Sequence, residues 1–203
     1  MRCAAPLSND GCQPGGFKLW ESTLDVVRVL DETALAKDNN HARVLDLGCG
    51  SGLLGVHVLL SMPRARVTFQ DLNEAVLSET ALVNIGLIAG RDGLDRARLV
   101  FGPWHAGALA LFPAGQRFDL IVTSETLYDA ANFIALHRLL EDTLAPGGRV
   151  LVGAKRFYFG VGGGAAAFME FASRRGVFDT RLALTMADGA SNLRDVFWME
   201  RRA

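Results

Sequence analysis

The stretch Val44-Leu45-Asp46-Leu47-Gly48-Cys49-Gly50-Ser51-Gly52 joins an apolar strand, one acid near its end and three closely spaced glycines. Glycine lets a chain turn tightly, and it lets a ligand approach the backbone where a Cβ would collide. The helix that we expect to begin near Leu53 points its N-terminal N–H groups at the same place. The stretch therefore predicts a site where a nucleoside lies against bare backbone.

The same glycines fit two nucleotide-binding patterns. Gly50 to Gly55 matches G-x-G-x-x-G, so the run alone does not separate NAD from S-adenosylmethionine. Asp46 favours the second, because a carboxylate suits an ammonium and a sulfonium better than an anionic pyrophosphate. Asp71 ends the next apolar stretch, about 20 residues after the glycines, where a carboxylate can accept from both ribose hydroxyls. The alternative for Asp71 is the N-cap of the following helix.

Length and charge limit the possible classes of protein. The chain has 203 residues, half of them apolar, which predicts a single domain with a substantial core. We expect a short N-terminal extension over 1–14 and the domain over 15–203. The formal net charge is −1 and the charges are spread along the chain, so the basic patch of a nucleic-acid-binding protein is missing. We therefore predict no direct nucleic-acid partner, and we expect a monomer.

The cysteines and the apolar runs exclude further classes. Cys3, Cys12 and Cys49 have neither the spacing of a metal site nor that of a disulfide framework, and the four histidines add no ligand pattern. We predict no metal. No apolar run approaches the ~20 residues of a membrane span, and the N-terminus does not resemble a signal peptide. We expect a cytoplasmic protein without a membrane partner, and nuclear entry stays open.

Apolar stretches with strand character alternate with helical periodicity along the chain. We expect strands at 43–47, 66–70, 98–101, 118–123, 149–153, 178–186 and 196–199, and helices at 17–35, 53–62, 74–88, 132–144 and 165–173. The last two strands form a closing pair around the turn Asp188-Gly189, and the helix before 149–153 ends at Pro146-Gly147-Gly148. The pattern predicts a Rossmann-like, doubly wound, mostly parallel α/β sheet, whose ligands lie beyond the carboxyl ends of the strands.

Several segments resemble one family of enzymes: 15–21, 45–55, 69–73, 123–128 and 158–164. Together they are similar to the protein-histidine methyltransferases that modify ribosomal protein uL3. These are class I, seven-strand enzymes, in a group that also contains many protein-lysine methyltransferases. The resemblance runs from about Gly15 to the C-terminus, and 15–21 and 158–164 are its most specific parts. It implies S-adenosylmethionine as cofactor and methyl transfer to the tele nitrogen of a histidine, with uL3 as the protein substrate.

The resemblance also implies a set of cofactor-binding residues: Trp20, Asp46, Gly48, Gly50, Gly52, Gln70, Asp71, Asn73, Gly102, Trp104, Thr123 and Ser124. Asp46 would serve the charged amino end, and the indole of Trp104 would border the adenine. Pro103 departs from the family pattern, which has a glutamate there. Alternatives stay open for Trp20, which shares a helical stripe with Leu24 and so fits core packing, and for Thr123 and Ser124, which can instead cap the next turn.

Glu125 and Tyr128 are the predicted catalytic residues. They form E-T-L-Y, which resembles the acidic-x-x-aromatic signature at the mouth where a target side chain enters. The alternative is an exposed turn carboxylate beside a half-buried tyrosine. Neutral imidazole, with a pKa of about 6.5, already has a free lone pair, whereas lysine, at about 10.4, must first lose a proton. We expect Glu125 to accept one ring N–H, and Tyr128 to contact the ring or the sulfonium.

The segment Gly160 to Gly164 is glycine-rich and follows three aromatic residues. It lacks G-K-[ST], which argues against nucleotide hydrolysis. The alternatives are a flexible connection and a substrate-facing loop with aromatic walls, and we predict the second. The predicted substrate-loop residues are Phe157, Tyr158, Gly160, Gly162 and Gly163.

Three functions remain open from the sequence. The first is a protein-histidine methyltransferase, and the second is a protein-lysine methyltransferase of the same group. The third is a non-catalytic module that uses the cofactor fold to bind a ribosomal protein. An intact glycine motif with Asp46 and Asp71 argues against the third, because a pure binding module does not need them.

Overall fold

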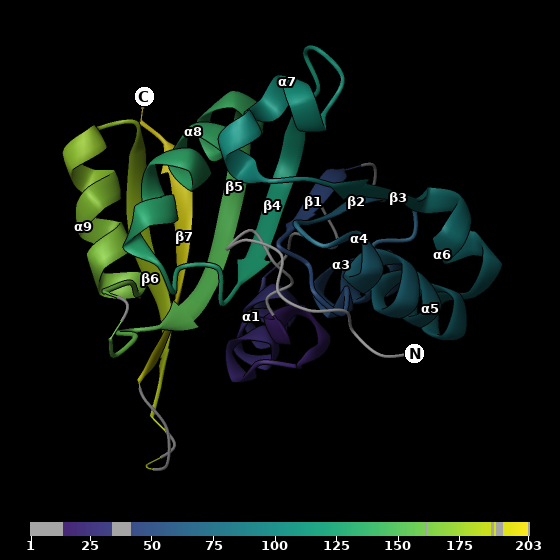
Figure 1. The fold of residues 1–203 in the computed structure, drawn as a ribbon, viewed down its shortest axis with the longest axis horizontal. Helices are drawn as coiled ribbons and strands as arrows, with labels where there is room; N and C mark the ends of the chain where they lie inside the picture. The colour runs from purple at the N-terminus through teal and green to yellow at the C-terminus, as the bar shows by residue number, and fades with distance from the viewer. Residues whose placement is uncertain (1–13, 34–41, 161, 188, 190–192, 203) are drawn as a thin grey trace, which may run out of the picture.

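The computed structural model describes residues 14–33, 42–160, 162–187, 189 and 193–202. Their centre is one seven-stranded sheet with the order β3-β2-β1-β4-β5-β7-β6 (Figure 1). The strands are β1 (Arg43–Leu47), β2 (Arg66–Asp71), β3 (Ala97–Phe101), β4 (Phe118–Ser124), β5 (Leu144–Lys155), β6 (Phe178–Met186) and β7 (Arg194–Arg201). The first five run parallel, and β7 is antiparallel to both of its neighbours. The predicted doubly wound, mostly parallel sheet is confirmed.

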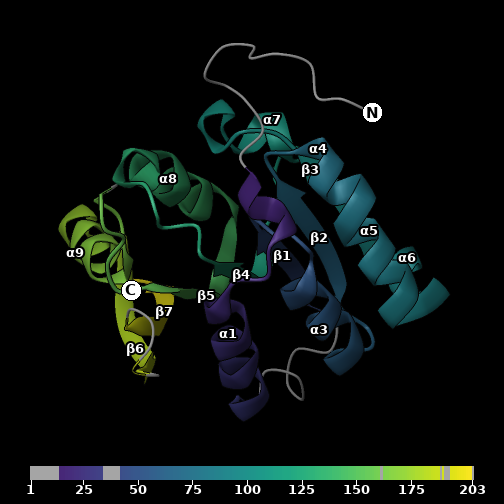
Figure 2. The same ribbon diagram turned by 60° about the horizontal axis from the view of Figure 1, so that its bottom comes forward.

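Helices cover both faces of the sheet (Figures 1 and 2). One face carries α1 (Glu21–Glu32), α3 (Leu53–Ser61) and the helical stretch that contains α4 (Glu74–Val76), α5 (Leu82–Asn84) and α6 (Gly90–Arg96). The other face carries α7 (Ala108–Leu111), α8 (Phe133–Thr143) and α9 (Ala165–Arg175). Each layer packs its own apolar cluster against the sheet, as parallel strands that are buried on both faces require.

The chain order reverses at β1, which lies between β2 on one side and β4 on the other. Val44 is the register partner of Val67 on β2 and of Leu120 on β4, so the three strands are aligned. In open α/β sheets the ligand crevice lies outside the carboxyl ends of the strands at such a switch point. A ligand site is therefore expected at the segments after β1, β2 and β4.

The strand β5 begins earlier than predicted. It starts at Leu144, so Pro146-Gly147-Gly148 belongs to the strand instead of ending a helix. Phe118 pairs with Leu144 but Leu120 pairs with Arg149, which places the extra residues in a bulge. A proline has no N–H for a ladder, and a bulge is where a strand tolerates it.

The first helix is shorter than predicted, because α1 begins at Glu21 and ends at Glu32. Trp20 stands before it in an extended conformation, and the side chain of Leu24 is 60% exposed. The alternative of a packed helical stripe through Trp20 and Leu24 is therefore wrong. The closing pair of strands is confirmed as β6 and β7, while Asp188 of the predicted turn lies outside the described residues.

Two further predictions concern what the chain lacks. In the described part of the chain, no helix is both long enough and apolar enough to cross a membrane. In that same part, no three histidine, cysteine or acidic side chains come close enough together to bind a metal ion. The predicted extension over 1–14 lies outside the described residues except for Pro14, which begins a short 3-10 turn, η1 (Pro14–Phe17).

Candidate active site

The glycine loop after β1 has the conformation that its sequence predicts. Gly48, Gly50 and Gly52 have φ of 64°, 52° and 76°, a region that favours glycine. A Cβ on Gly48 would lie 2.6 Å from Cγ2 of Thr126, so this position also has no room for a side chain. The N–H of Cys49 donates to the carbonyl of Gln70 over 2.8 Å. The loop is therefore held between the ends of β2 and β4.

Asp46 lies under this loop with 1% of its surface exposed. Its Oδ2 accepts the N–H of Gly55 over 2.8 Å, which satisfies one of the free N–H groups in the first turn of α3. Burial raises the pKa of Asp46 to about 8; the bond from Gly55 opposes this shift, and the charge of Asp71 adds to it. Asp46 thus links the loop to α3 from inside the protein. Its predicted role toward an amino group stays a prediction.

The raised pKa of Asp46 predicts how stability depends on pH. The folded protein keeps a proton on Asp46 between its ordinary pKa of 3.8 and about 8, whereas the unfolded chain has lost it. The contribution of Asp46 to stability is therefore fully present below this window and is lost through it, by up to about 1.4 kcal/mol per pH unit. Asp46→Asn still accepts from Gly55 but does not titrate. The free energy of unfolding, measured with urea between about pH 5 and pH 8, should fall more steeply in the wild type than in Asp46→Asn. The same pH dependence in both proteins would contradict this expectation.

Gln70 has no exposed surface, and all its described partners lie within the protein. Its Oε1 accepts from Nε1 of Trp104 over 2.9 Å and from the N–H of Gly48 over 3.4 Å. Its Nε2 donates to the carbonyl of Gly102 over 2.8 Å. Its predicted place at the ribose and adenine stays a prediction. Gln70 uses its amide within the protein. It positions Gly48, Gly102 and the half-buried indole of Trp104.

Asp71 fixes the loop from the end of β2. Its Oδ2 accepts the N–H of Gly50 over 2.9 Å, and its Oδ1 accepts the N–H of Asn73 over 3.1 Å. The N-cap of α4 is Asn73, whose side chain accepts from Ala75, so the capping alternative for Asp71 is wrong. A carboxylate has about four acceptor sites, and these bonds use two of them. Asp71 keeps the capacity to accept two hydroxyl groups.

Thr123 is buried and joins β4 to β1. Its hydroxyl donates to the carbonyl of Leu47 over 2.7 Å and pairs with the hydroxyl of Thr126 at 2.8 Å. Both bonds lie inside the protein, and the predicted contact of Thr123 with the cofactor stays a prediction. Ser124 is half-buried and accepts from the hydroxyl of Thr23 over 3.1 Å.

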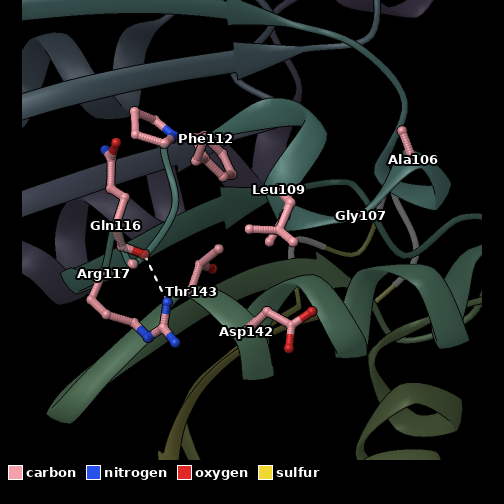
Figure 3. Close-up of a pocket in the computed structure, with 11 residues that line it drawn as sticks. Ala106, Gly107, Leu109, Phe112, Gln116, Arg117, Asp142 and Thr143 are labelled. Carbon is pink, nitrogen blue, oxygen red and sulfur yellow. Dashed lines mark hydrogen bonds between the residues drawn. The ribbon is translucent and has the colours of Figure 1, made fainter.

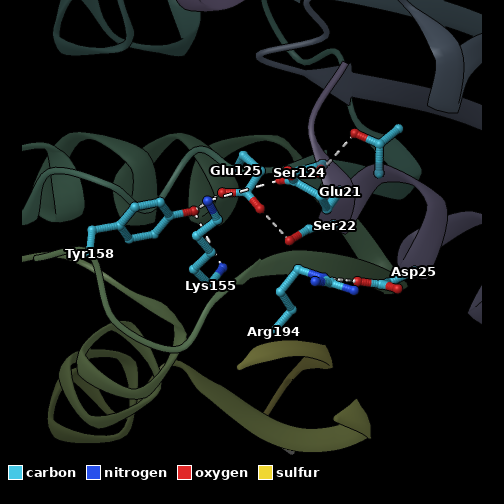
Figure 4. A network of polar contacts seen from close by, with 9 residues as sticks. Glu21, Ser22, Asp25, Ser124, Glu125, Lys155, Tyr158 and Arg194 are labelled. Carbon is cyan, nitrogen blue, oxygen red and sulfur yellow. Dashed lines mark hydrogen bonds and ion pairs between the residues drawn. The ribbon is translucent and has the colours of Figure 1, made fainter. Parts of the chain in front are cut away.

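Glu125 has a conformation that no other described non-glycine residue shares, with φ of 57°. Only 8% of its surface is exposed, and its N–H donates to the carbonyl of Gly153 over 2.8 Å. Its Oε1 accepts from the hydroxyl of Ser22, and its Oε2 accepts from the hydroxyl of Tyr158 (Figure 4). The alternative of an exposed turn carboxylate is wrong. Backbone strain of this kind costs about 1–3 kcal/mol and is concentrated at functional sites.

Tyr158 and Tyr128 differ in their surroundings. The hydroxyl of Tyr158 points inward to Glu125, whereas Phe159 beside it is 91% exposed and Phe157 is also exposed. The predicted aromatic walls stay a prediction. Burial, and then the charge and the hydrogen bond of Glu125, raise the pKa of Tyr158 far above its ordinary value. Tyr128 is 38% exposed, and burial followed by the charges of Asp129 and Asp71 raises its pKa.

The glycine-rich segment lies against the turn that contains Glu125 and Tyr128. Gly162 pairs with Asp129, and the N–H of Gly164 donates to the carbonyl of Leu127 over 2.8 Å. The N–H of Tyr158 donates to the carbonyl of Gly163 over 3.1 Å. The structure thus brings the predicted substrate loop next to the predicted catalytic turn, with Gly160 and Gly162 exposed and Gly163 buried. Their roles toward a substrate stay predictions.

Trp20 is half-buried between two lysines. Nζ of Lys18 lies 4.4 Å and Nζ of Lys155 lies 5.5 Å from its ring centroid. Lys155 also approaches Glu21, with 3.9 Å between Nζ and Oε2. Trp20 is therefore next to Lys155, which belongs to the network drawn in Figure 4, and its contact with a cofactor stays a prediction.

Two residues of the site were missed in the sequence, Ser22 and Thr126. A signal for Ser22 was present, because it occupies the apolar stripe of α1 at the spacing of Val26 and Val29, and all three are buried. A serine at such a position needs a buried hydrogen-bond partner. Thr126 has no comparable signal, since its partner Thr123 is set by the turn itself.

Cys49 is the free cysteine of the described residues and lies within the glycine loop. Its Sγ donates to the carbonyl of Gly50 over 3.8 Å. Burial raises the pKa of the Cys49 thiol well above its ordinary value, and the charges of Asp46 and Asp71 raise it further. The thiol is therefore protonated in the folded protein.

A separate hollow of about 390 Å³ lies between α7, the loop after it and the end of α8 (Figure 3). Its lining is Ala106, Gly107, Ala108, Leu109, Phe112, Pro113, Gly115, Gln116, Arg117, Asp142 and Thr143. Arg117 directly precedes β4 and Thr143 directly precedes β5, so the hollow reaches the amino ends of these strands. None of its residues belongs to the predicted site, which lies at the carboxyl ends.

The sequence matches the model of a family described as lysine methyltransferase over residues 6–169. The chain is 37% identical to the histidine protein methyltransferase 1 homolog of Dictyostelium discoideum over 186 residues, which are 92% of this chain and 58% of that protein. It is 34% identical to the homolog of Rattus norvegicus over 202 residues, which are 88% of this chain and 55% of that protein. The chain thus spans about half the length of the curated relatives it matches.

Solved structures agree on the fold. The glycopeptide N-methyltransferase MtfA complexed with S-adenosyl-L-homocysteine has a TM-score of 0.64 at 18% identity, covering 89% of this chain and 87% of that one. The ribosomal protein L11 methylase of Lactobacillus delbrueckii subsp. bulgaricus has a TM-score of 0.63 at 18% identity, covering 92% of this chain and 81% of that one. At 18% identity, both similarities show the fold alone.

Proposed function

Since the chain belongs to the lysine methyltransferase family, we propose that it transfers a methyl group from S-adenosylmethionine to a histidine side chain of a protein. The similarity to histidine protein methyltransferase 1 homologs of two organisms supports histidine as the target. The observation that carries the proposal is the Glu125 carboxylate, which is fixed by two hydroxyl groups at the carboxyl end of β4. A fixed acceptor of this kind suits a reaction that depends on orientation.

The residues around the glycine loop fit S-adenosylmethionine. Asp71 keeps two acceptor sites for the ribose hydroxyls, and the turns at Gly48 and Gly50 leave backbone beside it without side chains. The half-buried indole of Trp104 is fixed by its bond to Gln70 and supplies a flat surface for a purine. When bound, S-adenosylmethionine supplies a methyl group on a positively charged sulfonium.

Glu125 would act on the target ring through one hydrogen bond. A neutral imidazole carries one N–H and one free lone pair, and which nitrogen carries the proton depends on its partner. If Glu125 accepts the N–H of the pros nitrogen, the lone pair of the tele nitrogen is left for methylation. The same carboxylate then stabilises the positive charge that the ring gains. Tyr128, beside this turn and partly exposed, would contact the ring.

Lysine is the second candidate target, because the matched family is described by that activity. A lysine side chain, with an ordinary pKa of about 10.4, must lose a proton before it can accept a methyl group, whereas imidazole at about 6.5 is already neutral. A carboxylate that already accepts two hydroxyl donors is better suited to orient a neutral ring than to remove a proton from an ammonium.

The finer proposal is that the substrate is ribosomal protein uL3, methylated at the tele nitrogen, as the family resemblance of Tyr158 to Gly164 implies. We further propose that the chain acts in the cytoplasm as a monomer, without a nucleic-acid or membrane partner, and nuclear entry stays open. These proposals concern a chain that spans 58% of its Dictyostelium relative.

A labelling experiment tests the proposed function. Recombinant uL3 with its target histidine, or with alanine there, is incubated with the protein and labelled S-adenosylmethionine, and the product is hydrolysed for amino-acid analysis. We expect labelled tele-methylhistidine from the intact substrate alone. Label on lysine would assign the second candidate. Cofactor binding by calorimetry without any label on uL3 would reject this substrate, and the absence of cofactor binding would leave the non-catalytic module.

A further inference from the structure

We propose that Ser22 and Tyr158 are positioning residues that orient the Glu125 carboxylate for methyl transfer, an inference that rests on the proposed function. The three residues come from separate parts of the chain: α1, the segment after β5 and the segment after β4 (Figure 4). Each oxygen of Glu125 accepts from one of the two hydroxyls. The carboxylate cannot rotate without breaking one of these bonds, so its remaining acceptor sites have fixed directions.

The direction of each hydrogen bond follows from the other contacts. The hydroxyl of Tyr158 accepts the backbone N–H of Lys155 over 3.3 Å, which leaves its single proton for Glu125. Ser22 is fully buried in the first turn of α1, and its hydroxyl donates to the other oxygen. About two of the four acceptor sites of the carboxylate stay free for the N–H of a target ring.

The backbone of Glu125 is fixed as firmly as its side chain. A φ of 57° is unfavourable for a glutamate, and such a conformation persists only where the surroundings determine it. Here the N–H of Glu125 is bonded to Gly153 on β5, and both carboxylate oxygens are bonded to hydroxyls. Tertiary contacts at both ends of the residue therefore compensate for its local strain.

The glycine-rich segment from Gly160 to Gly164 keeps Tyr158 beside Glu125. The N–H of Tyr158 donates to Gly163, and Gly164 donates to Leu127, two residues after Glu125. A Cβ on Gly163 would lie 2.1 Å from the carbonyl oxygen of Leu127, so only glycine allows this close packing. In the proposal, the glycine-rich segment therefore holds Tyr158 close to the turn that carries Glu125.

A titration that needs no substrate tests the contact. The chain has two tyrosines, so Tyr128→Phe leaves Tyr158 as the only phenol. We expect no phenolate absorbance from this variant until alkali unfolds the protein, as followed by circular dichroism, because burial and Glu125 raise the pKa of Tyr158. Ionisation of Tyr158 at an ordinary tyrosine pH in the folded protein would overturn the contact.

A kinetic cycle tests the positioning role. We expect Tyr158→Phe and Ser22→Ala each to lower kcat on uL3 about tenfold, with unchanged affinity for S-adenosylmethionine. In a Glu125→Gln background neither change should lower kcat further, because both act through the carboxylate. Ser61→Ala, which removes an exposed hydroxyl from the end of α3, is the control and should match the wild type.

The outcomes separate this inference from the proposed function. Additive losses in the Glu125→Gln background, or wild-type turnover of Tyr158→Phe and Ser22→Ala, would overturn the positioning role while histidine methylation stands. If the wild type labels lysine on uL3, the same cycle is measured on that product. If it labels nothing on uL3, the positioning role is rejected together with the proposed substrate, and the titration still decides whether Tyr158 contacts Glu125.

Discussion

Glu125→Gln is expected to lower kcat for the proposed histidine methylation by about 100-fold while the affinity for S-adenosylmethionine changes by less than about twofold. The amide keeps the shape of the side chain, but it has one acceptor oxygen where the carboxylate has two. Ser22 and Tyr158 both donate to this group, and the amide turns one of the two accepting positions into a donor. The arrangement that would direct an acceptor at an imidazole N–H is therefore disrupted. Steady-state kinetics on uL3 and calorimetry with the cofactor measure the two effects.

Asp129→Asn is the matched control for this change. Asp129 follows in the same turn, and its side chain accepts the N–H of Ala131 over 2.9 Å, a bond that asparagine can keep. The control should retain turnover within about twofold of the wild type, since it removes a carboxylate without touching Glu125. Equal losses in the two variants would indicate a general effect of charge, and wild-type turnover of Glu125→Gln would remove Glu125 from the mechanism.

Asp71→Ala is expected to weaken binding of S-adenosylmethionine by about 10- to 100-fold, because hydrogen bonds to a charged group contribute about 1.5–3 kcal/mol. The variant loses the proposed acceptors for the ribose hydroxyls, and it also frees the N–H groups of Gly50 and Asn73. Titration calorimetry with the cofactor measures the dissociation constant, and circular dichroism checks that the variant is folded.

Glu74→Ala provides the comparison, since it removes an exposed acid from the first turn of α4 close to Asp71. We expect its affinity for the cofactor to stay within about twofold of the wild type. If Asp71→Ala and Glu74→Ala bind the cofactor equally well, Asp71 only stabilises the loop and the ribose assignment is rejected.

Features that depend on neighbouring residues could be predicted from the sequence. The strand at 43–47 is confirmed to the residue, and the positive φ angles of Gly48, Gly50 and Gly52 follow from a glycine run between a strand and a helix. The order of the elements also predicted the doubly wound sheet, because alternating strands and helices have few ways to pack.

Features that depend on distant residues could not be predicted. Ser22 and Glu125 are separated by 103 positions, and Tyr158 and Glu125 by 33, so no local pattern links them. The sequence also could not show that Gln70 and Thr123 use their polar groups inside the protein, since that depends on where Trp104 and Leu47 lie. The sequence could indicate which candidate site residues matter. Only the fold shows which groups they form hydrogen bonds with.

The protonated thiol of Cys49 has a consequence for the chemical durability of the protein. The thiolate is the form of cysteine that reacts with peroxide, disulfides and alkylating agents. Burial first, and then the neighbouring acidic residues, raise the pKa of this thiol, so the loop carries its sulfur atom in the less reactive thiol form. We therefore expect the loop around Gly48 and Gly50 to react slowly with such reagents at neutral pH.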